Sequence, residues 1–551
     1  MAIYPASPSW IGQPQVKGSS ETMRMFLLTL SMVGLSFCWG TEFTYANPFL
    51  LSLGMSKSSL SLVWVAGPLS GLVVQPIIGV LSDQSTSKYG RRRPYMLAGT
   101  AAVAVCYLVL GWSKEIAQFW VRDEEAAKRY AIMLSVVDIY VLDFVINISQ
   151  STCRALVVDT LPISKQQAGS AWIGRQGAVG TLLVYGIGAL DLQSLLGDFL
   201  GDTQFKKVCF IAVIGMAVPQ CITCWAVQER VLLQDRRKQG STMEKIASVF
   251  SQIYATFRHV PDRIQNICWV QFWSWIGYFP FLFYCSTWVG EIYLRHEAPA
   301  DLPSSALDTV GRRGSMSMIV WSVISFVASI VLPWFVENPA RDDQVTYTAR
   351  PPPRIAGVLG SLSSYKPTLL TTWAAANLLF ASAMIFAPLV QSVALATFLI
   401  ALCGVPWAVA QWAPTAFIGI EINRISTSIP LSQMRRSADH GTPVDDEAES
   451  SILHLRHDSD SDLSSSTGQL AGAYLGLLNI YTTLPQFVGT AISWVVFSIF
   501  EPGQSAELSE GGKPDSGESA KPGVSGIGVC LFIGAICAVR AAWSTRRLRP
   551  G

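Results

Sequence analysis

The sequence predicts an all-α membrane protein with twelve transmembrane helices arranged in two six-helix bundles. Half of the 551 residues are hydrophobic, only 14% are charged, and 18 are tryptophan. A soluble chain of this length would need much more polar surface. Stretches of about 20 apolar residues, the length that crosses a bilayer, recur along the chain. The formal net charge of +2 does not point to nucleic acid as a partner.

Six spans fall on either side of a polar segment, a pattern typical of transporters built from two bundles. In the first half we expect spans at 25–50, 60–82, 95–113, 130–156, 168–190 and 207–227. In the second half we expect them at 267–289, 315–336, 367–388, 392–419, 470–499 and 524–543. The predicted domains are a cytoplasmic tail, a first bundle, a central cytoplasmic loop and a second bundle, at 1–23, 24–228, 229–264 and 265–545.

Lysines and arginines near the span ends predict that both termini lie in the cytoplasm. That orientation places four basic loops and the C-terminal arginines inside, although Arg312, Arg313 and the bases near 113–130 fall outside and oppose it. We expect a multi-pass protein of the plasma membrane, with the vacuolar membrane as the alternative.

Two long polar segments interrupt the second bundle. Residues 420–468 are rich in serine and acidic residues, and residues 501–523 are rich in Gly, Ser and Glu. Such compositions cannot bury enough apolar surface to fold, so we expect a disordered cytoplasmic loop and a disordered external loop. For the first, control by phosphorylation is the alternative to a plain solvated segment.

Ionisable side chains within the predicted spans are concentrated in the first half of the chain. Each is costly at membrane depth and usually faces a cavity or a charged partner. They are Glu42, Asp138, Asp143, Arg154 and Arg175. We predict that Glu42 pairs with Arg175, and Arg154 is the alternative partner.

The fourth span carries one continuous polar face. At 3.6 residues per turn, this face contains Asp143, Asn147, Gln150, Ser151 and Arg154. The acid and the arginine stand three turns apart, about 16 Å, and cannot pair within the helix. We interpret the face as a cavity wall with a titratable acid; the alternative is a structural polar seam between helices. None of the five histidines lies in a span, so any coupled proton must be carried by a carboxylate.

The second half contributes aromatic and amide side chains instead of charges. Aromatic rings bind the apolar faces of sugars and amides bind their hydroxyls, so these residues suit a neutral polyol. The candidates are Gln271, Trp275, Gln411 and Asn479. Interfacial aromatic belts and core packing are the alternative explanation for the aromatic residues.

The second span ends in an acidic residue, and a loop with three arginines follows it. The span contains Gly67, Gly71 and Gly79, and small residues allow close helix packing. Asp83 stands at its end, and Arg91, Arg92 and Arg93 follow. The segment resembles the cytoplasmic gating loop of the major facilitator superfamily; simple positive-inside anchoring is the alternative for the arginines.

These motifs together resemble the proton-coupled sucrose transporters of the glycoside–pentoside–hexuronide group, within the major facilitator superfamily. The resemblance rests on Leu62–Pro94 with its Gly-Arg-Arg-Arg-Pro loop, on Leu142–Asp159, on Phe279–Gly290 and on Trp39-Gly-Thr-Glu42-Phe-Thr-Tyr45. The last motif is similar to the fungal and animal branches. Lys57 stands where plant members have a histidine, and such departures favour the fungal α-glucoside branch.

The resemblance implies the major facilitator fold and assigns roles to several residues. It implies that Asp143 carries the coupled proton and that Arg154 is needed for transport. Tyr45 joins the candidates for the substrate or charge network. We therefore expect a monomeric symporter, embedded in the lipid bilayer, that imports sucrose- or maltose-type α-glucosides with protons.

The rival function is a membrane sugar sensor that binds sugar without net transport, supported only by the long 420–468 loop. The sequence has no nucleophile–base pair and no metal-ligand cluster, so we expect neither an enzyme nor a metal or cofactor.

Overall fold

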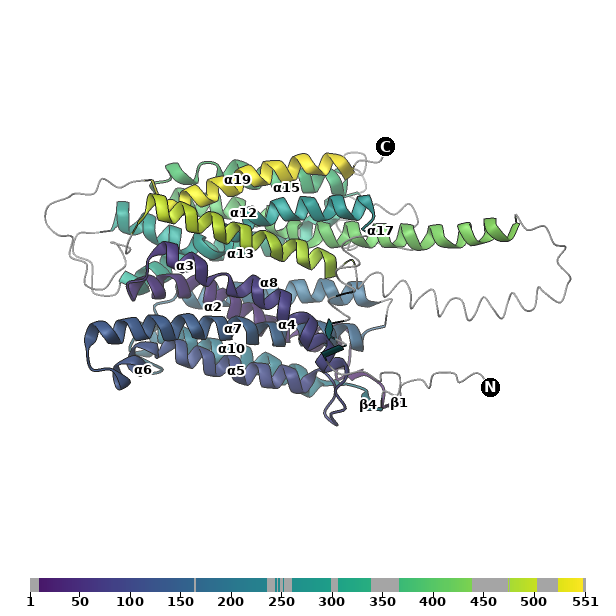
Figure 1. Ribbon diagram of the computed structural model, residues 1–551, viewed down its shortest axis with the longest axis horizontal. Coiled ribbons are helices and arrows are strands. Elements are labelled where there is room, and N and C mark those ends of the chain that lie inside the picture. The colour runs from purple at the N-terminus through teal and green to yellow at the C-terminus, as the bar shows by residue number, and fades with distance from the viewer. Residues whose placement is uncertain are drawn as a thin grey trace.

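The computed structural model consists of long, nearly parallel helices grouped into two bundles, one from each half of the chain (Figure 1). It describes residues 9–162, 165–234, 260–298, 306–337, 366–438, 476–502 and 524–548, with residues 243, 244, 246, 247, 251 and 474 in addition. Strand β1 (Ser9–Ile11) and the C-terminal end of α19 (Gly526–Ser544) lie at the same end of the molecule (Figure 1). We call this the termini end, and the opposite one the distal end.

The first bundle contains most of the charged residues discussed above. Its helices are α1 (Glu21–Thr29), α2 (Ser31–Ser52), α3 (Lys57–Val63), α4 (Ala66–Asp83), α5 (Arg93–Gly111), α6 (Ser113–Trp120), α7 (Glu124–Thr160), α8 (Gln166–Ala189), α9 (Leu192–Leu196) and α10 (Gln204–Ala226).

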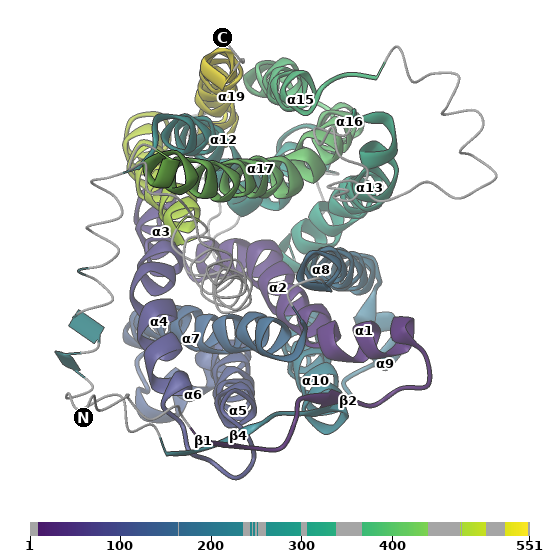
Figure 2. The ribbon, with the colours of Figure 1, turned by 90° about the vertical axis from the view of Figure 1, so that its right-hand side faces the viewer.

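The second bundle packs against the first chiefly through α12 and α13. Its helices are α12 (Asp262–Ile292), η2 (Tyr293–Glu297), α13 (Ala306–Phe335), α15 (Leu369–Met384), η4 (Ala387–Leu389), α16 (Val393–Leu402), α17 (Gly404–Ala438), the helix at Gly476–Phe500, α19 (Gly526–Ser544) and η5 (Thr545–Leu548). In the end-on view of Figure 2, α2 and α8 of the first bundle face α13 of the second.

Ten helices in the described part of the chain are long and apolar enough to cross a membrane. They confirm ten of the twelve predicted spans. The other two predicted spans, 168–190 and 267–289, are helices α8 and α12. Glycine and glutamine in α8, and tryptophan, tyrosine and glutamine in α12, make these two helices less apolar than their neighbours.

Helix starts follow ordinary capping chemistry. Ser20, Asp123 and Thr203 each accept a hydrogen bond from the backbone N–H three residues further on, at the starts of α1, α7 and α10. Such a cap satisfies one of the N–H groups that the first turn leaves without a partner. The caps therefore define where these membrane helices begin.

The predicted polar loop at 420–468 begins later than expected. Helix α17 continues to Ala438, whereas the sequence predicted a disordered loop from residue 420. The helix continues because Ile418 and Ile422 are still buried in the core of the second bundle, and Glu421 lies 3.7 Å from Arg263 of α12. The remainder of that loop, and residues 503–523 of the external one, lie outside the described residues.

Two small antiparallel sheets attach the N-terminal tail to the segment that follows the first bundle, which the sequence did not indicate. Strand β1 (Ser9–Ile11) pairs with β4 (Val231–Gln234), and β2 (Gln15–Val16) pairs with β3 (Val227–Gln228). The Lys17 ammonium lies 3.8 Å from the centre of the Trp225 ring. The predicted tail is therefore folded from residue 9 onward.

Glycine allows the closest helix contacts in the first bundle. A Cβ atom added to Gly180 of α8 would lie 2.3 Å from the backbone oxygen of Val33 in α2. A backbone atom cannot move aside as a flexible side chain can, so α2 and α8 need glycine at this position to approach as they do.

We predict that Gly180→Ala destabilises the protein by about 1–3 kcal/mol, the range for overpacking a close contact. The control is Gly174→Ala in the same helix, where an added Cβ meets nothing within 4 Å. Thermal unfolding of the purified variants measures the difference. Equal unfolding temperatures for the two variants would show that the α2–α8 contact is looser than described.

Candidate functional site

The predicted polar face of α7 passes from a fully buried end to an exposed one. Asp143 and Asn147 are buried, Gln150 and Ser151 are partly buried, and Arg154 is exposed. Because α7 runs from the distal end toward the termini end, exposure increases toward the termini end. The face is therefore sealed near its middle and accessible from one side.

Asn147 joins both bundles through a chain of amide hydrogen bonds. Its Nδ2 donates to Ser70 Oγ at 2.8 Å, and its Oδ1 accepts from Gln75 Nε2 at 2.9 Å. Gln75 Oε1 accepts in turn from Asn479 Nδ2 of the second bundle at 3.3 Å. The structure thus brings together Asn147 and Asn479, two predicted site residues 332 positions apart, through a glutamine that the sequence analysis did not include.

Asp143 is fully buried, and neither of its carboxylate oxygens has a hydrogen-bond partner among the described residues. Glu42 of α2 is in the same situation. Asp143 and Asp138 are near enough to Glu42 to interact with it electrostatically. Three carboxylates in a low-dielectric interior cannot all be ionised without a cation or water to compensate them. The cluster is therefore suited to holding protons.

The predicted pair between Glu42 and Arg175 does not form. The Arg175 guanidinium lies 5.7 Å from the centre of the Trp172 ring in its own helix. Arg154, the alternative partner, makes no ion pair within the described part of the chain. The sequence showed opposite charges in one bundle, but their separation depends on how α2, α7 and α8 are rotated about their axes.

The remaining candidates of the second bundle lie at different depths. Gln271 Nε2 donates to Thr482 Oγ1 at 3.5 Å, one turn along the helix from Asn479. The Trp275 ring packs 5.9 Å from the Trp407 ring, and its indole nitrogen has no partner among the described residues. Gln411 is exposed on α17. Gln271 therefore contacts the helix that carries Asn479, one turn away from that asparagine.

Tyr45 lies away from the polar face. Its hydroxyl donates to the Gly188 carbonyl oxygen at 2.9 Å, and its ring packs against Phe205 and the backbone of Gly311. It therefore fills the contact between α2, α8 and α13 near the distal end. In contrast, Trp39, which no functional argument included, donates its indole N–H to Gln150 Oε1 at 2.9 Å.

The loop that carries Arg91, Arg92 and Arg93, which we call the arginine loop, forms its ion pairs within the first bundle. Arg92 Nε donates to Asp159 Oδ2 at 2.8 Å, and the same guanidinium contacts Asp83. Arg91 Nη2 lies 2.8 Å from Asp159 as well. These contacts connect the ends of α4 and α7 to the start of α5.

Glu229 binds the backbone of the same loop. Its carboxylate accepts hydrogen bonds from three successive N–H groups, those of Arg91, Arg92 and Arg93, each at 2.9 Å. Gly90 has φ of 108°, and a Cβ added to it would lie 2.5 Å from Glu229 Oε1. The glycine that precedes the three arginines is thus required both by its backbone conformation and by the carboxylate beside it.

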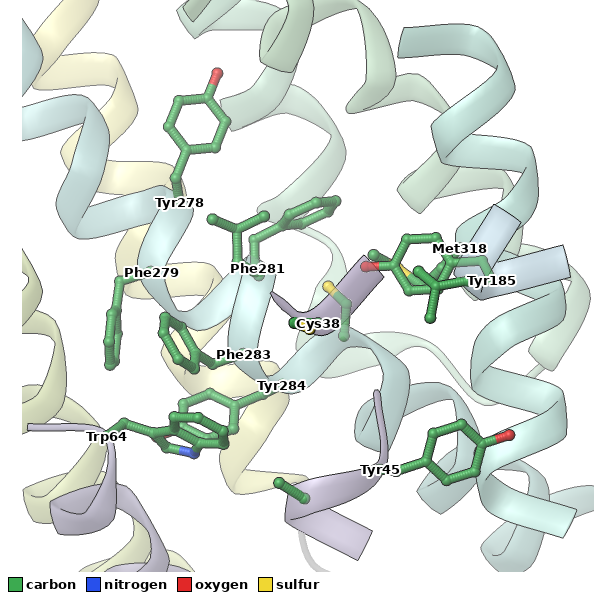
Figure 3. Close-up of a cluster of buried hydrophobic side chains, with 14 of the residues drawn as sticks. Cys38, Tyr45, Trp64, Tyr185, Tyr278, Phe279, Phe281, Phe283, Tyr284 and Met318 are labelled. Carbon is green, nitrogen blue, oxygen red and sulfur yellow. The ribbon is translucent and has the colours of Figure 1, made fainter. Parts of the chain in front are cut away.

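Aromatic side chains close the space between the bundles on the distal side of Asp143. Phe283 of α12 packs against Phe43 and Trp64 of the first bundle, with ring centres 4.6 Å apart in each pair. Trp64 Nε1 donates to Asn47 Oδ1 at 2.7 Å, and Asn47 donates to the Phe283 carbonyl oxygen. Figure 3 shows Trp64 and Phe283 within this aromatic cluster. We call Phe43, Trp64 and Phe283, together with Asn47, the aromatic plug.

A buried ion cluster ties the bundles together beyond the plug. Lys57 of the first bundle lies 3.0 Å from Glu291 of α12 and also contacts Glu501. Arg295 contacts the same two carboxylates. Lys57 and Glu291 are almost completely buried. The ion pair between them therefore replaces the contacts with water that each charge has lost.

A second ion pair crosses between the bundles at the distal end. Arg312 Nη1 of α13 lies 2.7 Å from Asp191 Oδ2, just after α8. The hydrogen bond from the Ser194 backbone, and then the nearby Arg312 guanidinium, hold the pKa of the Asp191 carboxyl below its ordinary value. Asp191 therefore stays ionised and paired. Arg312, which opposed the predicted orientation, has a specific structural partner.

Two bundles of membrane-spanning helices, one from each half of the chain, are the architecture of the major facilitator fold. Solved structures support the fold. The chain superposes on a proton-dependent oligopeptide transporter structure with a TM-score of 0.54 and 10% identity, covering 96% of this chain and 98% of the other. The xylose transporter XylE from E. coli, in a partially occluded inward-open conformation, gives 0.52 and 12%, with 96% and 99% covered.

The pattern of the MFS/sugar transport protein family matches residues 29–286 of the chain. The chain is 28% identical to the general alpha-glucoside permease of Schizosaccharomyces pombe, over 97% of this chain and 94% of the permease. It is 31% identical to sucrose transport protein SUC4 of Arabidopsis thaliana, over 50% of this chain and 56% of that protein. Relatives and fold are those of transporters rather than enzymes.

We predict that Glu42 is energetically coupled to Asp143 and not to Arg175. In double-mutant cycles on the free energy of unfolding, Glu42→Gln with Asp143→Asn should deviate from additivity. Each neutral side chain removes the electrostatic repulsion that the other carboxylate would feel. Glu42→Gln with Arg175→Gln should be additive within about 0.5 kcal/mol. A large coupling in the second cycle would contradict the arrangement described here.

We predict that Lys57→Met destabilises the protein by about 3 kcal/mol, because it leaves two buried carboxylates with less compensation. Adding Glu291→Gln to that variant should restore part of the loss. The control is Lys128→Met, which removes an exposed pair with Glu124 at 3.3 Å and should change stability by less than about 1 kcal/mol. Equal unfolding temperatures for the two single variants would mean that the cluster contributes nothing.

Proposed function

We propose that the protein imports α-glucosides such as sucrose or maltose together with protons, by alternating access of one central site. The termini end faces the cytoplasm in this proposal, and the plasma membrane is the expected location. Similarity to a fungal alpha-glucoside permease over almost the whole chain supports the substrate class. The plant sucrose transport proteins, similar over shorter regions, support it as well.

The observation that carries the proposal is the buried, unpartnered carboxylate of Asp143. It lies within electrostatic range of Glu42, which Asp138 also approaches, on a helix face that opens toward Arg154. A carboxylic acid needs no counter-charge in its neutral form, whereas the carboxylate does. Binding and release of one proton at this position therefore changes the charge of the interior.

The closed distal side and the exposed termini side support assignment of this conformation to an inward-facing state. The aromatic plug and the cluster around Lys57 close one side. On the other side, Arg154 is exposed at the end of the polar face. Opening the distal side requires Lys57 to leave Glu291 and Glu501, and Phe283 to leave Trp64. Rocking of the bundles about the amide chain of Asn147, Gln75 and Asn479 would exchange the two states.

In this proposal the sugar binds between the polar face of α7 and the second bundle. Amides of Gln75 and Asn479 can exchange their mutual hydrogen bond for sugar hydroxyls, at little net cost because one bond replaces another. The exposed Arg154 guanidinium supplies a fork of further donors. Trp275, whose indole N–H is without a partner among the described residues, can stack against the apolar face of the sugar and donate to a hydroxyl.

We predict that Asp143→Asn abolishes uphill accumulation of labelled sucrose or maltose while the protein remains folded in the membrane. Asparagine keeps the shape of the side chain but cannot carry the proton. Exchange of labelled for unlabelled sugar across the membrane, which needs no net proton movement, should persist. The surface variant Glu124→Gln is the control and should accumulate sugar as the unchanged protein does.

Uptake in whole cells with and without a protonophore measures this prediction. Normal accumulation by Asp143→Asn would show that the coupled proton is held elsewhere, with Glu42 as the next candidate. If the unchanged protein binds sugar but never accumulates it, the sensor function replaces the transport function.

A further inference from the structure

A cavity lined by aromatic and polar side chains lies between α12 and the C-terminal helices α19 and η5. Its volume is about 310 Å³, and it is lined by Asn266, Trp269, Trp273, Arg540, Ser544 and Arg547. Two of these residues are arginines and none is acidic. None belongs to the polar face, the aromatic plug or the arginine loop, so the proposed transport function leaves this cavity unexplained.

Arg540 has no anionic partner within the part of the chain that the structure describes. Its Nη1 atom is buried and donates no hydrogen bond to any of the described residues. The guanidinium stacks between two indoles, 5.7 Å from the centre of the Trp273 ring and 4.5 Å from that of Trp543. Stacking on rings attracts a cation but does not satisfy its N–H groups. An arginine one turn inside the end of a membrane helix is costly until an anion joins it.

Exposed apolar side chains stand next to the lining residue Arg540 on α19. Ile536, Val539 and Trp543 of α19 are 51%, 46% and 53% exposed. Val539, Arg540 and Trp543 follow Ile536 by three, four and seven residues, so these four share one face of α19, and Arg547 follows in η5. In a membrane this exposed apolar face contacts acyl chains. The same face therefore presents apolar groups at membrane depth and cationic groups toward the helix end.

We propose that this cavity binds the headgroup of an anionic phospholipid. The phosphate is held between Arg540 and Arg547, the indole N–H groups of Trp269 and Trp273 serve as additional donors, and the acyl chains lie along Ile536 and Val539. Tryptophan at headgroup depth and paired arginines between membrane helices are the groups that recognise such lipids. A free phosphate ion would satisfy the arginines but would leave the adjoining apolar face without its occupant.

The test uses the full-length protein in nanodiscs of phosphatidylcholine alone or of phosphatidylcholine mixed with phosphatidylserine. Native mass spectrometry after release into detergent measures the retained phosphatidylserine. Arg547→Gln and Arg540→Gln should each retain about tenfold less than the unchanged protein, since each removes a charge-assisted hydrogen bond. Arg546→Gln is the matched control, because Arg546 is exposed beside the site but does not line it.

Arg547 is itself exposed, so its variant carries the test even if Arg540→Gln fails to fold. Equal retention by the Arg547 variant and the unchanged protein would overturn the proposal. Equal loss with Arg546→Gln would overturn it too, because the attraction would then be a diffuse effect of surface charge. A third arm adds inorganic phosphate to the protein in detergent. If phosphate displaces the bound phosphatidylserine, the site recognises a soluble anion and the lipid assignment is wrong.

Discussion

The cost of charge in a low-dielectric interior governs the arrangement of this protein. Every buried ionic group in the first bundle is either compensated, as Lys57 is by Glu291 and Glu501, or left without a partner in the described part of the chain, as Asp143 and Glu42 are. Compensated charges tie helices together in one conformation, because separating them would expose both to an apolar environment. Uncompensated carboxylates can remain buried only by binding protons or by meeting a cation, so they respond to what enters the site.

The two kinds of charge lie at different depths, and the proposed function depends on that separation. The compensated cluster and the aromatic plug join α2 and α3 to α12 at the distal end, where they hold the bundles closed. The uncompensated acids lie nearer the middle of α2 and α7, beside the amide chain through which Asn147 reaches Asn479. A change in the charge of Asp143 or Glu42 therefore acts where the two bundles meet. The ionic contacts at the distal end determine how much free energy is needed to open that end.

Part of the site followed from spacing in the sequence. Asp143, Asn147, Gln150 and Arg154 had to share a face because helix geometry places residues 4, 7 and 11 positions apart on one side. Gln75 could also have been found, since it is a polar residue in the middle of an apolar span. The contact between Trp39 and Gln150, and that of Glu229 with three backbone N–H groups, had no such signal. They depend on which helix stands beside which, and on loops that approach only after the bundle has packed.

The sequence alone determined the membrane class, the positions of most spans, the polar face of α7 and the concentration of intramembrane charge in the first half. These properties are local, because hydrophobicity and helical periodicity act within a single span. Only the tertiary structure decided that Glu42 lies near Asp143 rather than Arg175, that Tyr45 packs away from the polar face, and that Lys57 pairs with carboxylates more than 200 residues away. Those contacts depend on how each helix is rotated about its axis and how deep it lies relative to its neighbours. Small residues such as Gly180 permit the close packing, but the sequence of one span does not specify it.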